Sequence, residues 1–187
     1  MLQLLPLRFV AGTVLALTIV AALGATPASA ATSPSTWASS VCGALDSWVS
    51  DISTASAKVA ESKPKSTANV KQKLTKLVAL AQRETSSLLA DLKSAGRPEV
   101  KGGKQIAATL REGFAQVQRI ISGAKKTLAK TSTKDPTAFL NATRSVQDAL
   151  ESGLEGVQAA FSAVRTADAA PLLAAFTANK RCQAVAA

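Results

Sequence analysis

Apolar residues recur at helical spacing in four successive segments of the chain. The first segment runs from Trp37 to Val59, and its steps are three or four residues throughout. This spacing places the apolar side chains on one face of a helix. The members of the first stripe are Trp37, Val41, Leu45, Trp48, Ile52, Ala55 and Val59. The pattern predicts a long amphipathic helix over this segment.

Three further stripes follow, separated by short polar breaks. The second consists of Val70, Leu74, Leu77, Ala81, Leu88 and Leu92. The third consists of Ala107, Leu110, Phe114, Val117, Ile121, Ala124 and Leu128. The fourth consists of Phe139, Val146, Leu150, Val157, Phe161 and Val164. The third has the alternating steps of a heptad. Each stripe predicts a helix of about 25–33 residues, roughly 40–50 Å long.

Turn-forming residues mark the start of the chain and the first break. Residues 31–36 are Ala, Ser, Thr and Pro, a composition that predicts a short flexible lead. The Lys-Pro-Lys sequence at 63–65 ends the first helix. Either Ser66 or Thr67 can then cap the second, because a hydroxyl at this position accepts a hydrogen bond from the first helical turn.

The later breaks carry stronger signals. Gly96 suits the position just past the end of the second helix, and Pro98 suits the first position of the third. Asp135 is expected to cap the fourth helix, with Pro136 at its first position. The second and third helices should therefore be joined by only a few residues, which makes them antiparallel neighbours.

A short fifth helix is expected after Asp168, with Pro171 in the tolerated first turn and Cys182 along its length. Short connections between long amphipathic helices favour a closed bundle over a dimer seam or a cofactor-binding face. The predicted fold is all-α: an up-and-down four-helix bundle with a short fifth C-terminal helix, stapled by one disulfide.

Residues 1–30 have the three-part layout of a cleavable signal peptide. Arg8 is the only charged residue, an uncharged apolar run spans 9–23, and Ala28 to Ala30 form an A-x-A site. The 15-residue run is shorter than the roughly 20 residues that a transmembrane helix needs, so cleavage is favoured over an uncleaved anchor. Cutting after Ala31 is a close alternative. Cleavage would leave residues 31–187 as one secreted domain in the extracellular space or the cell envelope.

Two cysteines remain in the exported chain, Cys42 and Cys182. Export leads to a compartment that permits disulfides. In the predicted topology the first helix starts, and the fourth ends, at the same end of the bundle. The fifth helix could then carry Cys182 across that end to Cys42, and one disulfide is expected.

Several features of the chain occur together: the signal-peptide layout, the stretches around Trp37 to Cys42 and Leu45 to Trp48, and an Ala-rich tail with Phe176 and Cys182. This arrangement resembles small secreted helical proteins of high-GC Gram-positive bacteria. The resemblance implies export, a helical fold and a Cys42–Cys182 bridge. It implies no activity.

Recognisable catalytic chemistry is missing from the sequence, so a non-enzymatic protein is expected. The chain has no His, which removes the usual general base and the commonest metal ligand. No metal site or cofactor is expected. Glu151 and Glu155 lie one turn apart and suit a solvated helix face better than a carboxylate pair in a substrate pocket. The Lys101 to Lys104 sequence, Lys-Gly-Gly-Lys, is only turn-like.

Charged residues are distributed unevenly along the chain. Residues 31–187 carry 21 basic and 12 acidic side chains, and 16 of the basic ones fall within 63–134 beside only 4 acidic ones. The predicted topology gathers ten lysines at the end opposite the disulfide. They are Lys58, Lys63, Lys65, Lys71, Lys73, Lys76, Lys125, Lys126, Lys130 and Lys134. A solvated end is the plain interpretation. The alternative is a site for an anionic ligand.

Lys125, Lys126 and Lys130 suit a helix C-terminus, whereas Lys71, Lys73 and Lys76 near a helix start oppose the dipole and suggest a use. The expected ligands are an anionic wall polymer, an anionic lipid surface or extracellular nucleic acid bound without reading its sequence. Lys in place of Arg argues against sequence-specific nucleic-acid recognition. Two other functions stay open: a lipid-handling protein whose helices open onto lipid, and a structural or partner-binding envelope protein. The oligomeric state is left open.

Overall fold

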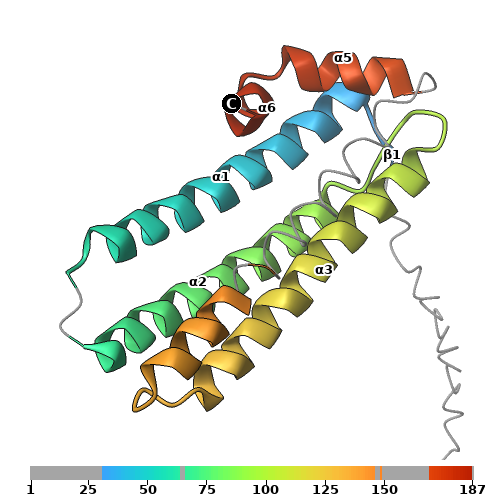
Figure 1. Ribbon diagram of the computed structural model, residues 1–187. Coiled ribbons are helices and arrows are strands. Elements are labelled where there is room, and N and C mark those ends of the chain that lie inside the picture. The colour runs from blue at the N-terminus through green and yellow to red at the C-terminus, as the bar shows by residue number, and fades with distance from the viewer. Residues whose placement is uncertain (1–30, 64–65, 146–147, 149–168, 187) are drawn as a thin grey trace, which may run out of the picture.

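Three antiparallel helices of equal length form the frame of the protein (Figure 1). The computed structural model describes residues 31–63, 66–145, 148 and 169–186. Helices α1 (Pro34–Glu61), α2 (Thr67–Ser94) and α3 (Gly103–Lys130) have 28 residues each. Helix α2 packs against both α1 and α3. The predicted stripes of the first three segments therefore correspond to three real helices of the expected length.

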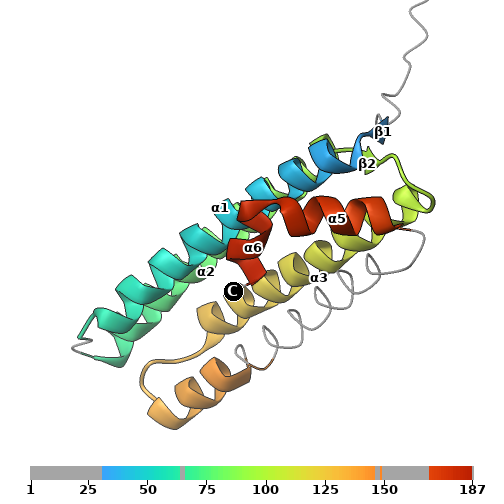
Figure 2. The same ribbon diagram turned by 90° about the horizontal axis from the view of Figure 1, so that it is seen from above.

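Two short helices complete the chain. Helix α5 (Ala170–Ala178) and helix α6 (Lys180–Ala186) both contact α1, and they lie beside its first half (Figure 2). The disulfide between Cys42 and Cys182 joins α1 to α6, with the two Cα atoms 5.0 Å apart. The protein is an all-α bundle with a short helical C-terminus and one disulfide, as the sequence predicts.

The start of the fourth predicted helix is also confirmed. Residues 136–145 are helical, and the Asp135 carboxylate accepts a hydrogen bond from the backbone N–H of Ala138 at 3.0 Å. Phe139, the first member of the fourth stripe, is 5% exposed. The rest of that stripe lies outside the described residues, as do the predicted signal peptide, Glu151, Glu155 and the expected cap Asp168.

The predicted flexible lead is wrong. Residues Ala31–Thr32 form strand β1, which pairs in parallel with strand β2 (Arg97–Pro98). Ser33 then caps α1, because its hydroxyl accepts a hydrogen bond from the backbone N–H of Thr36 at 3.2 Å. A Ser followed by Pro at the first helical position is a recognisable helix start. That signal places the beginning of α1 at Pro34.

Pro98 does not begin α3, as its sequence context suggested. It lies in β2, and α3 starts at Gly103 after a tight turn. Gly96 and Gly102 have φ angles of 73° and 74°, a left-handed conformation that favours glycine. A Cβ on Gly103 would overlap the carbonyl oxygen of Pro98, so the turn folds back onto the helix start too closely for any side chain.

The predicted fifth helix is divided into two at Asn179. The Asn179 side-chain oxygen accepts hydrogen bonds from the backbone N–H groups of Arg181 and Cys182, at 3.0 and 3.4 Å. This capping starts α6 as a new helix. Cys182 therefore reaches Cys42 after a change of direction, and not along one continuous helix across the end of the bundle.

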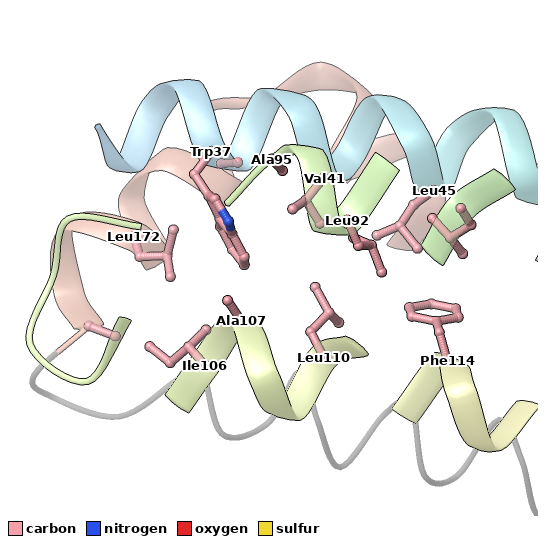
Figure 3. Packing of buried hydrophobic residues seen from close by; sticks show 13 residues of the cluster. Trp37, Val41, Leu45, Leu92, Ala95, Ile106, Ala107, Leu110, Phe114 and Leu172 are labelled. Carbon is pink, nitrogen blue, oxygen red and sulfur yellow. The ribbon is translucent and has the colours of Figure 1, made fainter. Parts of the chain in front are cut away.

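The apolar core is divided into two clusters along the bundle. The first lies where α1, α2, α3 and α5 meet and surrounds Trp37, Leu110, Phe114 and Leu172 (Figure 3). The second is built by α2, α3 and Phe139 around Val117, Ile121 and Leu128. Trp48 packs against both clusters. Among the described residues no helix is long and apolar enough to cross a membrane.

Two tryptophan N–H groups tie the helices together. Trp37 Nε1 donates to the carbonyl oxygen of Gly96 at 3.3 Å, and Trp48 Nε1 donates to the hydroxyl of Thr85 at 3.0 Å. Trp37 meets Phe176 edge to face, and Trp48 meets Phe114 in the same manner. Of these two members of the first apolar stripe, Trp37 is buried in the core and Trp48 is half-buried.

Candidate functional site

The topology brings the predicted lysines to one end of the bundle. Helix α1 ends, α2 begins and α3 ends at this end, and residues 136–145 start there too (Figures 1 and 2). We refer to it as the lysine end. Nine of the ten predicted lysines belong to its described residues, whereas Lys65 lies outside them. The opposite end carries the β1–β2 pair, α5 and the start of α1.

Lys71 has a structural role that the sequence interpretation did not assign. Its Nζ donates hydrogen bonds to the carbonyl oxygens of Thr131 at 2.7 Å and Ala129 at 3.1 Å. These carbonyls lie at the C-terminus of α3, where the helix leaves its last oxygens without intrahelical partners and its dipole favours cations. The ammonium group of Lys71 therefore ties the start of α2 to the end of α3. The expectation that Lys71 lacks a structural reason is wrong.

Lys125 is also committed to a contact within the protein. Its Nζ donates to the side-chain oxygen of Gln82 at 3.0 Å. Gln82 lies 11 residues further along α2 than Lys71, which corresponds to about 16 Å of helix. The ammonium group of Lys125 is therefore held back from the tip of the lysine end. Neither Lys71 nor Lys125 is available to a ligand without losing these bonds.

Seven lysines remain without such contacts. Within the described part of the chain their ammonium groups form no hydrogen bond and no ion pair. All are exposed except Lys73, which is half-buried. We call this set the seven free lysines. They are Lys58, Lys63, Lys73, Lys76, Lys126, Lys130 and Lys134.

Few acidic groups are placed to neutralise this end. Glu61 closes α1 and is exposed, and the Asp135 carboxylate accepts the capping bond from Ala138. The ion pairs of the described residues are Arg83 with the half-buried Glu84 on α2 and Arg119 with Glu112 on α3, both away from the tip. Within the part of the chain that the structure describes, no ion pair therefore neutralises the seven free lysines.

The helix-dipole argument from the sequence is weaker than expected. Helix α2 begins at Thr67, so Lys73 and Lys76 lie in its second and third turns. The dipole effect falls off within the first turn of a helix. What distinguishes these lysines is the number of free cations gathered on one end.

The site has the chemistry of flexible primary ammonium groups. Lys side chains are point charges with rotatable donors, and they attract phosphate or carboxylate groups without imposing a fixed geometry. Among the described residues no group of His, Cys, Asp and Glu side chains could hold a metal ion. Thr85 is the one buried polar residue in the described part of the core, and its hydroxyl is bonded to the Ala81 carbonyl and to the Trp48 indole N–H. The described core therefore offers no unsatisfied polar side chain to a ligand.

Comparison with known proteins adds no relative: no protein-family model, curated protein or solved structure matches this chain.

Proposed function

We propose that this protein is exported and binds anionic polymers or surfaces of the cell envelope, without catalysis, through the seven free lysines. The observation that carries the proposal is the gathering of these uncompensated ammonium groups on one end of the bundle. Like charges held close together repel one another, and an anionic ligand relieves that repulsion while releasing its own counterions.

The proposal of export rests on the signal-peptide layout of residues 1–30 and on the disulfide. Disulfides persist in oxidising compartments outside the cytoplasm. A resemblance to small secreted helical proteins of high-GC Gram-positive bacteria agrees with this localisation. N-terminal sequencing of the protein recovered from culture medium tests it. A mature chain that still begins with Met1 or Leu2 contradicts a cleaved signal.

The residues of the lysine end suit a ligand that is recognised by its charge better than a nucleic acid that is recognised by its base sequence. Each described aromatic side chain is buried or half-buried, so none is offered as an exposed stacking platform. The free cations are all lysines, which lack the bidentate fork of Arg. The absence of His from the chain supports a role without general-base catalysis.

The binding proposal is tested with a variant that removes charge but keeps the structural lysines. The variant carries Gln at Lys73, Lys76, Lys126 and Lys130 and leaves Lys71 and Lys125 in place. A matched control carries Gln at four exposed or half-exposed cations away from the lysine end: Lys93, Arg97, Lys104 and Arg111. Both lose the same net charge. Circular dichroism confirms that both keep their helices.

The measurement is retention on an immobilised polyphosphate column as a function of salt. We expect wild type and control to elute together at higher salt than the lysine-end variant. The four lost contacts should lower the slope of log K against log salt by about 3, since each phosphate contact of a single-stranded polyanion contributes about 0.7. If the control variant loses as much retention as the lysine-end variant, binding depends on net charge alone and the proposed site is wrong.

A further inference from the structure

The two halves of α1 differ in how well their apolar face is covered. The buried residues of α1 all lie between Trp37 and Leu45. Trp48 is the last residue of this helix that packs against either core cluster, and it is half-buried. From residue 49 to the end of α1 no residue is buried. We call residues 49–61 the distal half of α1.

The apolar stripe nevertheless continues in register through the distal half. Ile52, Ala55 and Val59 keep the helical spacing of the buried residues before them, yet they are only half-buried and belong to neither cluster. Val49, beside this stripe, is 36% exposed. The sequence thus repeats a core pattern where the described structure supplies no closed core.

The described C-terminal helices contact the first half of α1. The first half of α1 is closed by α5 and α6 through the Cys42–Cys182 bridge and the contact of Trp37 with Phe176 (Figure 2). These helices have only 9 and 7 residues, so they cover a part of a helix that is 28 residues long.

The partly covered stripe leads directly into the lysine end. Lys58 lies in the last turn of α1, and Lys63 follows the helix; both belong to the seven free lysines. Apolar surface flanked by lysines on an amphipathic helix is typical of proteins that bind the interface of an anionic membrane. The lysine stems add apolar length while their ammonium groups reach the headgroups. A hydrophilic polymer would use the charges and leave the stripe unused.

We propose that the anionic ligand of the lysine end is a lipid surface, in which the seven free lysines contact phosphate headgroups while Ile52 and Val59 enter the interfacial layer. This inference rests on the proposed function and adds the class of ligand. It requires no membrane-spanning segment, since the contact is confined to one end of the bundle.

The test uses the mature, oxidised protein and vesicles of phosphatidylcholine with or without phosphatidylglycerol. The first variant carries Asn at both Ile52 and Val59. A matched control carries Leu173→Asn, which changes an apolar residue of α5 that is 41% exposed. We expect flotation with vesicles that contain phosphatidylglycerol, and a loss of about tenfold or more in vesicle affinity for the double variant, as follows from withdrawing two partly buried apolar side chains. Retention on polyphosphate should not change.

A second variant, Val59→Trp, keeps the test decisive if the Asn variant does not fold. Its added indole should shift to shorter emission wavelength with phosphatidylglycerol vesicles and not with soluble polyphosphate, measured as a difference from wild type. An unshifted emission overturns the lipid inference.

The outcomes separate the two proposals. If the wild-type protein binds polyphosphate but not vesicles, or if the double Asn variant floats as well as wild type, the ligand is a soluble polymer and the lipid inference is wrong. If the wild-type protein binds neither probe at low salt, the proposed function itself is wrong.

Discussion

The ammonium group of Lys71 lies 2.7 Å from the carbonyl oxygen of Thr131, a residue 60 positions later in the chain. This contact joins the beginning of α2 to the end of α3 at the lysine end. Lys71 therefore has a structural role that the seven free lysines lack. The distinction leads to the first prediction.

Replacing Lys71 by Met should destabilise the protein by about 1 kcal/mol, because the last carbonyls of α3 lose a charged donor at the negative end of the helix dipole. Lys76→Met is the matched control, since Lys76 lies on the same helix, is exposed and forms no side-chain hydrogen bond or ion pair with any described residue. Its effect should stay within about 0.5 kcal/mol. Urea unfolding followed by circular dichroism measures both. Equal effects of the two substitutions would contradict a structural role for Lys71.

The disulfide should contribute strongly to stability. It closes a loop of 140 residues, for which the chain-entropy model gives roughly 5 kcal/mol and measured bridges about 2–5 kcal/mol. The double variant Cys42→Ser, Cys182→Ser should therefore unfold at a markedly lower urea concentration. A reductant should shift the wild-type midpoint toward that of the double variant and leave the double variant unchanged. An unchanged wild-type midpoint after complete reduction would show that the bridge adds nothing.

Replacing each of two glycines of α3 by Ala should change the stability of the protein in opposite directions. Gly123 has no atom within 4 Å of a built Cβ, so Gly123→Ala should stabilise the helix by about 1 kcal/mol through its better propensity. Gly103→Ala should destabilise by about 1–3 kcal/mol, since its Cβ would overlap the backbone of Pro98. Thermal unfolding of the pair is the measurement. If both substitutions stabilise the protein, or both destabilise it, the close approach of Gly103 to Pro98 is contradicted.

The hydrogen bond between Trp48 and Thr85 should contribute more to the stability of the protein than the volume of the Thr85 side chain. Thr85→Val keeps the volume but removes the acceptor of the indole N–H, and should cost about 1–2 kcal/mol. Thr85→Ser keeps the hydroxyl and should cost less, about 1 kcal/mol for the lost methyl group. The comparison is made by urea unfolding monitored through Trp fluorescence. Val being tolerated better than Ser would overturn this assignment.

The fold was largely predictable because its long helices carry simple periodic patterns. The stripes of α1, α2 and α3 and the caps at Ser66 and Asp135 each follow from local residue preferences. The errors arose where tertiary contacts override local signals. Pro98 is a good helix starter, yet it pairs with Thr32 in a strand, and no local pattern reveals a partner 66 positions away.

The candidate site was predictable in position but not in detail. Antiparallel helices of equal length must bring the end of α3 beside the start of α2, and so the lysines meet. Which lysines are free depends on side-chain geometry. Lys71 and Lys125 both looked like members of the cluster, and only their bonds to Thr131 and Gln82 assign them to the scaffold. The incomplete burial of Ile52 and Val59 likewise does not follow from their spacing, which matches that of the buried residues of α1.

The packing of α1 against α5 and α6 has a consequence for the order of folding. The α2–α3 hairpin uses contacts between neighbours in sequence, which form quickly because little loop-closure entropy is lost. The buried face of α1 around Trp37 and Val41, by contrast, waits for Leu172 and Phe176 near the other end of the chain. During synthesis α1 emerges early, but the packing of its buried face is completed last. Its apolar face must therefore stay shielded or soluble until the C-terminus arrives and Cys182 can reach Cys42.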